Sequence, residues 1–296
     1  MLALHTFDTL STTGLKFTGL KKADTVTMIL SALQWRKING DIKLYCDKIF
    51  YSWLDEIGFT DIYSEIDKEL LDKSRDPNIN ISKQYGFWAS SKFYAMKEQI
   101  YPFFMLDMDL IVNLNLKYYT EQDFGLIAFG QERISNSWRD IPVYPPKENI
   151  WTPDGYVFDE RLDWETPPVN CALTYFEDLE LKDEYINEAF RFMKNNTLPD
   201  YSNNSKFPPM MMCYIEQRFL PMLAKLRGVK YSTFLSGYLG GTSVEALSST
   251  RFFHLWCAKH IPTLRIRMYK SLIKDLEKRY PIFYNRYLQI ENKLQD

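Results

Sequence analysis

The chain has 296 residues, and its 36 Lys and Arg nearly balance its 38 Asp and Glu, which gives a formal net charge of −2. This balance argues against a protein whose main task is to bind a nucleic-acid backbone, because such domains usually carry a clear basic excess. Hydrophobic residues make up 46% and charged residues 25% of the chain, a composition that excludes an intrinsically disordered protein.

The first hundred residues alternate short apolar runs with helical patterns. Strands are predicted at Leu2–Phe7, Ile42–Cys46 and Asp61–Ser64, and helices around Val26–Leu33 and over Ile49–Ile57 and Trp88–Gln99. We expect Asp24 to cap the first helix and Gly40 to end it. Residues 68–83 are polar and are expected to form a loop. The apolar strand predicted at Phe103–Leu106 leads directly into Asp107-Met108-Asp109.

The second half of the chain begins with an apolar run at Gly125–Phe129 and then changes character. Residues 138–168 contain six prolines and the rings of Trp138, Tyr144, Trp151 and Trp164, which predicts a long irregular segment. Beyond it we expect strands at Val169–Phe176 and Phe252–Trp256, and helices over Lys182–Lys194, Cys213–Arg227, Thr263–Arg279 and Ile282–Leu294. The alternation of strands and helices predicts an α/β fold with a mostly parallel central sheet flanked by helices.

Cysteine usage and the N-terminus indicate the compartment. The four cysteines are Cys46, Cys171, Cys213 and Cys257, and no pair has the spacing of a structural zinc site. We expect buried thiols in a reducing environment. The first residues lack the basic and apolar regions of a signal peptide, and no stretch approaches the ~20 apolar residues of a membrane span. These features predict a cytoplasmic protein.

The Asp-Met-Asp sequence after the strand at Phe103–Leu106 is the sharpest chemical feature. In α/β sheets, ligands bind outside the carboxyl ends of the strands, and Asp107 and Asp109 follow such an end. Two adjacent carboxylates repel each other unless a cation compensates them, and Mg²⁺ or Mn²⁺ prefers such oxygen ligands. We interpret the pair as a metal site; the alternative is a solvated turn.

Three further segments place polar side chains in apolar surroundings. His254 and Lys259 follow an apolar run and are candidates for a metal ligand and a diphosphate partner, or for a core histidine and a surface lysine. Asn170 begins an apolar strand and is either a ligand contact or a turn residue. Glu216, Gln217 and Arg218 lie on an apolar helix; a solvated face is the alternative, favoured most for Arg218.

Taken in order, these segments resemble the metal-dependent, DXD-motif glycosyltransferases of the GT-A fold, close to the family-8-like sugar-transferring enzymes. The matching segments are Phe103–Asp109, Asn170–Phe176, Glu216-Gln217 and His254–Lys259, with the helix that starts at Trp88 resembling the segment before the DXD strand. The chain departs from the pattern where Cys171-Ala172 follows Asn170 without a glycine. His254 and Lys259 are also one position closer than in the family and lack its intervening glycine.

The resemblance implies a GT-A-like fold and a nucleotide-sugar donor, most often UDP-linked, used with Mn²⁺ or Mg²⁺. It implies a catalytic domain over residues 1–262, with a nucleotide-binding part at 1–112 and an acceptor-side part at 113–262, and a helical tail at 263–296. The metal would lie on Asp107, Asp109 and His254. Asp107, Lys92 and Lys259 would bind the donor. Asn170, Glu216 and Gln217 would be the catalytic residues, and the acceptor a glycan or lipid-linked glycan.

Several assignments stay open at this point. A catalytic base could be Glu216, Asp163 or Asp178. The aromatic rings of residues 138–164 suit either an acceptor site or the anchoring of a long loop. The amphipathic C-terminal helices suit a core or dimer contact, or a membrane surface. Two other functions compete: a non-catalytic glycan- or nucleotide-binding protein, and a haloacid-dehalogenase-type phosphatase in which Asp107 would be the nucleophile.

Overall fold

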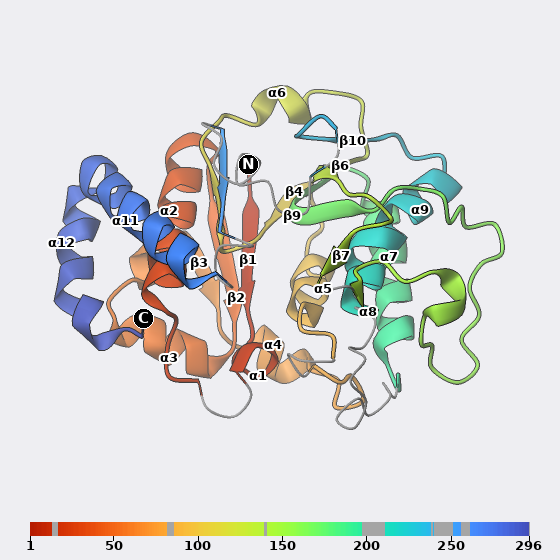
Figure 1. Cartoon of the computed structure of the whole chain (residues 1–296), viewed down its shortest axis with the longest axis horizontal. Coiled ribbons are helices and arrows are strands. Elements are labelled where there is room, and N and C mark those ends of the chain that lie inside the picture. Colours follow the sequence, from red (N-terminus) through yellow and green to blue (C-terminus); the bar gives the residue numbers. More distant parts are fainter. Residues whose placement is uncertain are drawn as a thin grey trace.

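The structure is a computed structural model, which describes residues 1–13, 17–81, 86–138, 141–196, 211–237, 239, 251–255 and 261–295. Lys259 and Cys257 lie outside the described residues. Figure 1 shows a central sheet with helices on either side of it. The predicted α/β class is therefore confirmed.

The central sheet has seven strands in the order β10-β6-β9-β4-β1-β2-β3. The strands are β1 (Ala3–Phe7), β2 (Ile42–Cys46), β3 (Glu65–Asp67), β4 (Phe103–Leu106), β6 (Leu126–Gln131), β9 (Val169–Phe176) and β10 (Tyr231–Thr233). Four neighbouring pairs are parallel, whereas β9 runs antiparallel to both β4 and β6. The reversed direction of β9 brings its first residues to the carboxyl ends of β4 and β6.

Helices cover both faces of this sheet (Figure 1). The helices are α1 (Thr9–Thr13), α2 (Lys22–Ile38), α3 (Lys48–Glu56), α4 (Leu70–Ser74), α5 (Ser90–Lys97), α6 (Lys117–Thr120), α7 (Leu179–Met193), α8 (Met211–Cys213), α9 (Phe219–Leu226), α11 (Pro262–Arg279) and α12 (Pro281–Ile290). Side chains of α2, α3, α11 and α12 build one apolar core, and those of α5, α7 and α9 build a second one. Each face of the sheet therefore has a core of its own.

Shorter elements complete the chain. In the described part of the chain, 3₁₀ turns lie at Thr60–Ile62, Lys147–Asn149 and Glu291–Lys293, and a π-helical turn at Tyr214–Arg218 joins α8 to α9. Two small antiparallel sheets pair β5 (Leu110–Val112) with β11 (Phe252–His254), and β7 (Ser137–Trp138) with β8 (Ile141–Pro142). The first of these small sheets continues the chain directly after Asp109 and supports the site described below.

The structure corrects several of the predicted element boundaries. Helix α2 begins at Lys22 after Lys21, so Asp24 lies inside its first turn and is not the cap. The strand predicted at Asp61–Ser64 is wrong: a 3₁₀ turn ends at Ile62, and β3 follows. The predicted loop at 68–83 contains α4, and just before this helix the side chain of Asp67 accepts the backbone N–H groups of Glu69 and Leu70.

The C-terminal helices pack onto the domain. Leu272, Leu276 and Tyr287 are buried in the core shared with α2, and the Tyr280 hydroxyl donates to Gln34 Oε1 at 2.7 Å. The core interpretation of these amphipathic helices is therefore confirmed. Among the described helices, none combines the length and the apolar character that crossing a membrane requires.

Candidate functional site

The Asp-Met-Asp turn leaves the carboxyl end of the fully buried strand β4. Its backbone is held at both ends: the Asp107 N–H donates to the Ala172 carbonyl of β9 at 2.8 Å, and the Leu110 N–H donates to the Asp107 carbonyl at 3.0 Å. A tight turn between a buried strand and β5 results. The backbone that carries both aspartates is therefore fixed at the sheet edge.

The turn meets His254 through the pairing of β5 with β11. His254 lies opposite Leu110 in this pairing, and the Leu255 N–H donates to the Asp109 carbonyl at 2.9 Å. The ring of His254 is 3% exposed, and its Nε2 lies 3.4 Å from Asp109 Oδ1. The ligand atoms of Asp107, Asp109 and His254 all lie within 4.8 Å of one another. Two carboxylates and an imidazole are a donor set that fits Mn²⁺ or Mg²⁺.

Lys92 lies between two carboxylates on the other side of Asp107. Its Nζ is 2.5 Å from Asp107 Oδ1 and 2.5 Å from Glu216 Oε1. Burial alone would lower the pKa of Lys92, but the charges of Asp107 and Glu216 outweigh it and raise the pKa above its usual value. The ammonium is therefore a permanent positive charge at this edge of the sheet.

Glu216 lies on the π-helical turn Tyr214–Arg218 and is 6% exposed. Burial raises the pKa of Glu216; Lys92 opposes this shift, and the negative charge of Asp107 adds to it. The Glu216 carbonyl accepts the Tyr185 hydroxyl at 3.0 Å and the Cys171 thiol at 3.2 Å. π-Helical turns are rare in proteins, and those that occur are often found at functional sites, because the extra residue redirects side chains.

Glu132 is a site residue that the sequence interpretation missed. It follows β6, whose carboxyl end lies at the same edge of the sheet as that of β4. Glu132 is 4% exposed and accepts Asn170 Nδ2 at 2.8 Å, Tyr144 Oη at 2.8 Å and Asn136 Nδ2 at 3.0 Å. A carboxylate directly after an apolar strand was the available signal, the same one that singled out Asp107.

The network around Glu132 reaches the π-helical turn through Tyr144. The Tyr144 hydroxyl also lies 2.6 Å from Gln217 Oε1, so one buried phenol connects Glu132 to Gln217. Asn170 is oriented from both ends of its amide, because its Oδ1 accepts the Ala172 N–H at 3.0 Å. The predicted residues Asn170 and Gln217 are thus joined by Glu132, which the prediction missed, and by Tyr144, which it named only among the aromatic rings of residues 138–164.

Arg218 is buried, so the solvated-face interpretation favoured for it is wrong. Its guanidinium donates to the Pro145 carbonyl at 2.6 Å and the Trp164 carbonyl at 2.8 Å, and its Cζ lies 5.1 Å from the Trp164 ring centroid. Trp164 stacks in turn on Tyr214, with ring planes 7° apart. In the segment 141–168, Tyr144 and Trp164 therefore act as anchors, whereas Trp151 remains 46% exposed.

The two other acids considered as a base have structural partners. Asp163 forms an ion pair with Lys225, with 2.5 Å between Oδ2 and Nζ, and also accepts the Glu165 N–H. Asp178 caps α7 by accepting the Leu181 N–H at 2.8 Å. Of the three candidates, Glu216 is the one beside Lys92 and Asp107.

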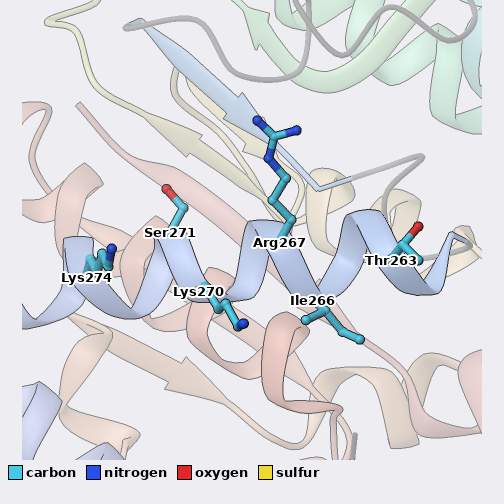
Figure 2. A pocket seen from close by; sticks show the side chains of 6 residues that line it. All are labelled: Thr263, Ile266, Arg267, Lys270, Ser271 and Lys274. Atoms are coloured by element: carbon cyan, nitrogen blue, oxygen red, sulfur yellow. The ribbon is translucent and has the colours of Figure 1, made fainter.

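A separate surface pocket of about 390 Å³ runs along α11. Figure 2 shows its lining residues on that helix, with Arg267 directed to the opposite side from Ile266 and Lys270. The lining residues are Thr263, Ile266, Arg267, Lys270, Ser271 and Lys274. None of them belongs to the group at the carboxyl end of β4.

Comparison with known proteins gives one family and a set of distant structures. A family model described as a family of unknown function (DUF6734) matches residues 18–290. No curated protein matches the chain.

Three of the solved structures that resemble the chain serve as examples. Mouse xyloside xylosyltransferase 1 in its apo form is 13% identical with a TM-score of 0.42, covering 86% of this chain and 97% of that one. The galactosyltransferase LgtC in complex with donor and acceptor sugar analogs is 11% identical with a TM-score of 0.41, covering 90% and 95%. The apo-form glycosyltransferase GlyE of Streptococcus pneumoniae TIGR4 is 15% identical with a TM-score of 0.38, covering 79% and 44%.

Proposed function

We propose that this chain, which belongs to the DUF6734 family of unknown function, is a glycosyltransferase that uses a nucleotide-sugar donor, UDP-linked, and a glycan acceptor. The observation that carries the proposal is the convergence of Asp107, Asp109 and His254 within 4.8 Å at the carboxyl end of β4. The ion pair between Lys92 and Asp107 places a cation beside the same edge. Carboxylates with a neighbouring cation suit a metal-bound diphosphate better than a neutral ligand.

Asp107, Asp109 and His254 would hold Mn²⁺ or Mg²⁺. When bound, the ion would supply Lewis-acid stabilisation for the negative charge of the departing diphosphate. In the transfer itself, the bond between sugar C1 and the diphosphate oxygen breaks, a bond from C1 to the acceptor oxygen forms, and the proton of the acceptor hydroxyl passes to the departing diphosphate. We assign the donor nucleotide to residues 1–112 and the acceptor to residues 113–262. Lys259 is proposed as a further diphosphate contact.

The side chains around Lys92 would orient the sugar. Lys92 bridges Asp107 and Glu216, because its ammonium lies 2.5 Å from an oxygen of each carboxylate. Asn170, Glu216 and Gln217 are proposed to contact the sugar as catalytic residues. Glu132 and Tyr144 hold two of these groups in place through the hydrogen bonds described above. Preorganised polar groups of this kind stabilise charge that develops in a transition state without reorganising.

The test is a thermal-shift screen of nucleoside diphosphates with and without MnCl₂, followed by hydrolysis assays over a panel of nucleotide sugars. A ligand at 100 times its Kd stabilises the folded chain by about 2.7 kcal/mol, a readily measured shift. We expect UDP with Mn²⁺ to stabilise the wild type and one UDP-sugar to be hydrolysed. Asp109→Asn should remove both effects. Asp123→Asn is the matched control, since Asp123 is an exposed acid paired with Lys230.

Each of the other outcomes supports a different function or contradicts the proposal. Stabilisation by a nucleotide without hydrolysis of any donor would support the non-catalytic binding protein. Hydrolysis of para-nitrophenyl phosphate that is lost in Asp107→Asn would support the phosphatase. If no nucleoside diphosphate shifts the wild type with metal present, the transferase proposal is wrong.

A further inference from the structure

A series of buried hydrogen bonds links Tyr63, His5 of β1 and Ser31 of α2 to the backbone of Leu110, directly after the Asp-Met-Asp turn. The Ser31 hydroxyl lies 2.6 Å from the Leu110 carbonyl, His5 Nε2 lies 3.2 Å from Ser31 Oγ, and the Tyr63 hydroxyl lies 3.2 Å from His5 Nδ1. His5 and Ser31 are fully buried, and Tyr63 is 5% exposed. Leu110 directly follows Asp109, so this series of hydrogen bonds ends on the backbone next to the candidate metal ligands.

The chemistry of the end group sets the direction of every hydrogen bond in this series. A carbonyl oxygen only accepts, so the single Ser31 hydroxyl proton points at Leu110. Ser31 Oγ must then accept from His5, which places the ring proton on Nε2. The bare Nδ1 accepts the proton of the Tyr63 hydroxyl. One arrangement of protons satisfies all four groups.

The state of the His5 ring agrees with this arrangement. Burial lowers the pKa of His5 to about 3, although the charge of Asp109 opposes the shift. The ring is therefore neutral at physiological pH, as a histidine that donates at one nitrogen and accepts at the other must be.

We propose that Tyr63, His5 and Ser31 form a directed hydrogen-bond relay that fixes the backbone at Leu110 and thereby positions Asp107 and Asp109 for a divalent cation. The inference rests on the proposed function, because it concerns the same metal site. The three residues do not touch the cation and are positioning residues. Partners behind metal ligands hold the ligands in their binding geometry, and their loss typically lowers metal affinity 10- to 100-fold.

The variant that tests the relay is Ser31→Ala, which removes the hydroxyl that contacts Leu110. Its matched control is Thr27→Val, because the Thr27 hydroxyl is equally buried on α2 but donates to the Ala23 carbonyl within the same helix, at 2.7 Å. The measurement is the Kd of Mn²⁺ by calorimetric titration of the full chain, alone and with excess UDP, beside the thermal midpoint of each variant.

We expect Ser31→Ala to weaken Mn²⁺ binding about tenfold or more and Thr27→Val to leave it within about twofold of the wild type. Tyr63→Phe should weaken it less than Ser31→Ala, and it tests the relay independently should Ser31→Ala fail to fold. Nitrogen-15 NMR of the His5 ring should show a proton on Nε2.

Two results would overturn the relay alone: unchanged Mn²⁺ affinity in both relay variants despite lower thermal midpoints, or a His5 proton on Nδ1. If the wild type binds no Mn²⁺ under either condition, the proposed metal site fails and the relay's role fails with it. The two failures are therefore distinguishable.

Discussion

Lys92 and Glu216 lie 124 positions apart in the sequence, yet Lys92 Nζ and Glu216 Oε1 are 2.5 Å apart in the fold. The same ammonium contacts Asp107, so one cation serves an acid from the strand end and an acid from the π-helical turn. Helix α5 supplies this cation from one face of the sheet. Lys92 thus connects Asp107, a proposed metal ligand, with Glu216, which is proposed to contact the sugar.

Replacing Lys92 with Met should destabilise the protein strongly. Removing Lys92 leaves the carboxylate of Glu216, whose side chain is 8% exposed, without its counter-charge; such a loss in a fully buried pair typically costs about 3–5 kcal/mol, and the partial exposure of Asp107 places the expected cost at the lower end of this range. Urea unfolding at neutral pH measures the effect. Lys97→Met is the control, since Lys97 is an exposed lysine at the end of the same helix and should change stability by no more than about 0.5 kcal/mol. Equal effects of the two substitutions would show that Lys92 is not the compensating charge.

The stability difference between wild type and Glu216→Gln should depend on pH. The pKa of Glu216 is raised in the folded chain above its ordinary value of 4.5, so the folded state takes up a proton before the unfolded state does. Stability from this group is therefore fully present below pH 4.5 and is lost as pH rises through the folded-state pKa. Thermal unfolding of both proteins from pH 5 to pH 8 should favour the wild type progressively at lower pH. A difference that stays constant or grows with pH contradicts the raised pKa.

Tyr144→Phe should separate Glu132 from Gln217 while leaving the aromatic packing intact. A buried polar group that loses its hydrogen-bond partner lowers the free energy of unfolding by about 1–3 kcal/mol. Because Gln217 would no longer be oriented by Tyr144, donor hydrolysis should fall as well. Unfolding by urea and the hydrolysis rate are the two measurements. Tyr156→Phe is the control from the same segment, because the Tyr156 hydroxyl donates to Glu188, which also pairs with Arg191 at the surface. Unchanged hydrolysis in Tyr144→Phe would separate this network from the activity.

Arg218→Met should loosen the segment that Arg218 anchors. Its two hydrogen bonds to the Pro145 and Trp164 carbonyls connect residues 141–168 to the π-helical turn, so their loss should promote local opening. Amide hydrogen exchange in this segment should accelerate, and Arg227→Met should leave it unchanged because Arg227 forms an exposed pair with Glu184. If exchange accelerates equally in both variants, Arg218 is not the anchor.

Local sequence patterns predicted the elements that carry the site. The uniform apolar run Phe103–Leu106 and the strand Val169–Phe176 are found as predicted, because both are buried on both faces and need no partner to be recognised. Element ends were predicted less well where a side chain set them. Asp67 accepts the backbone N–H groups of Glu69 and Leu70 just before α4, and a polar stretch alone does not reveal such a hydrogen bond.

The sequence by itself determined that two carboxylates follow a buried strand, and it singled out His254, Asn170 and the Glu216-Gln217 pair of an apolar helix as further candidates. Only the tertiary structure decided which of these groups meet. The antiparallel direction of β9 brings Asn170 beside Glu132, and α5 places Lys92 between Asp107 and Glu216. Such contacts join residues many positions apart, and they follow from strand order and direction, which no local pattern of hydrophobicity or charge encodes.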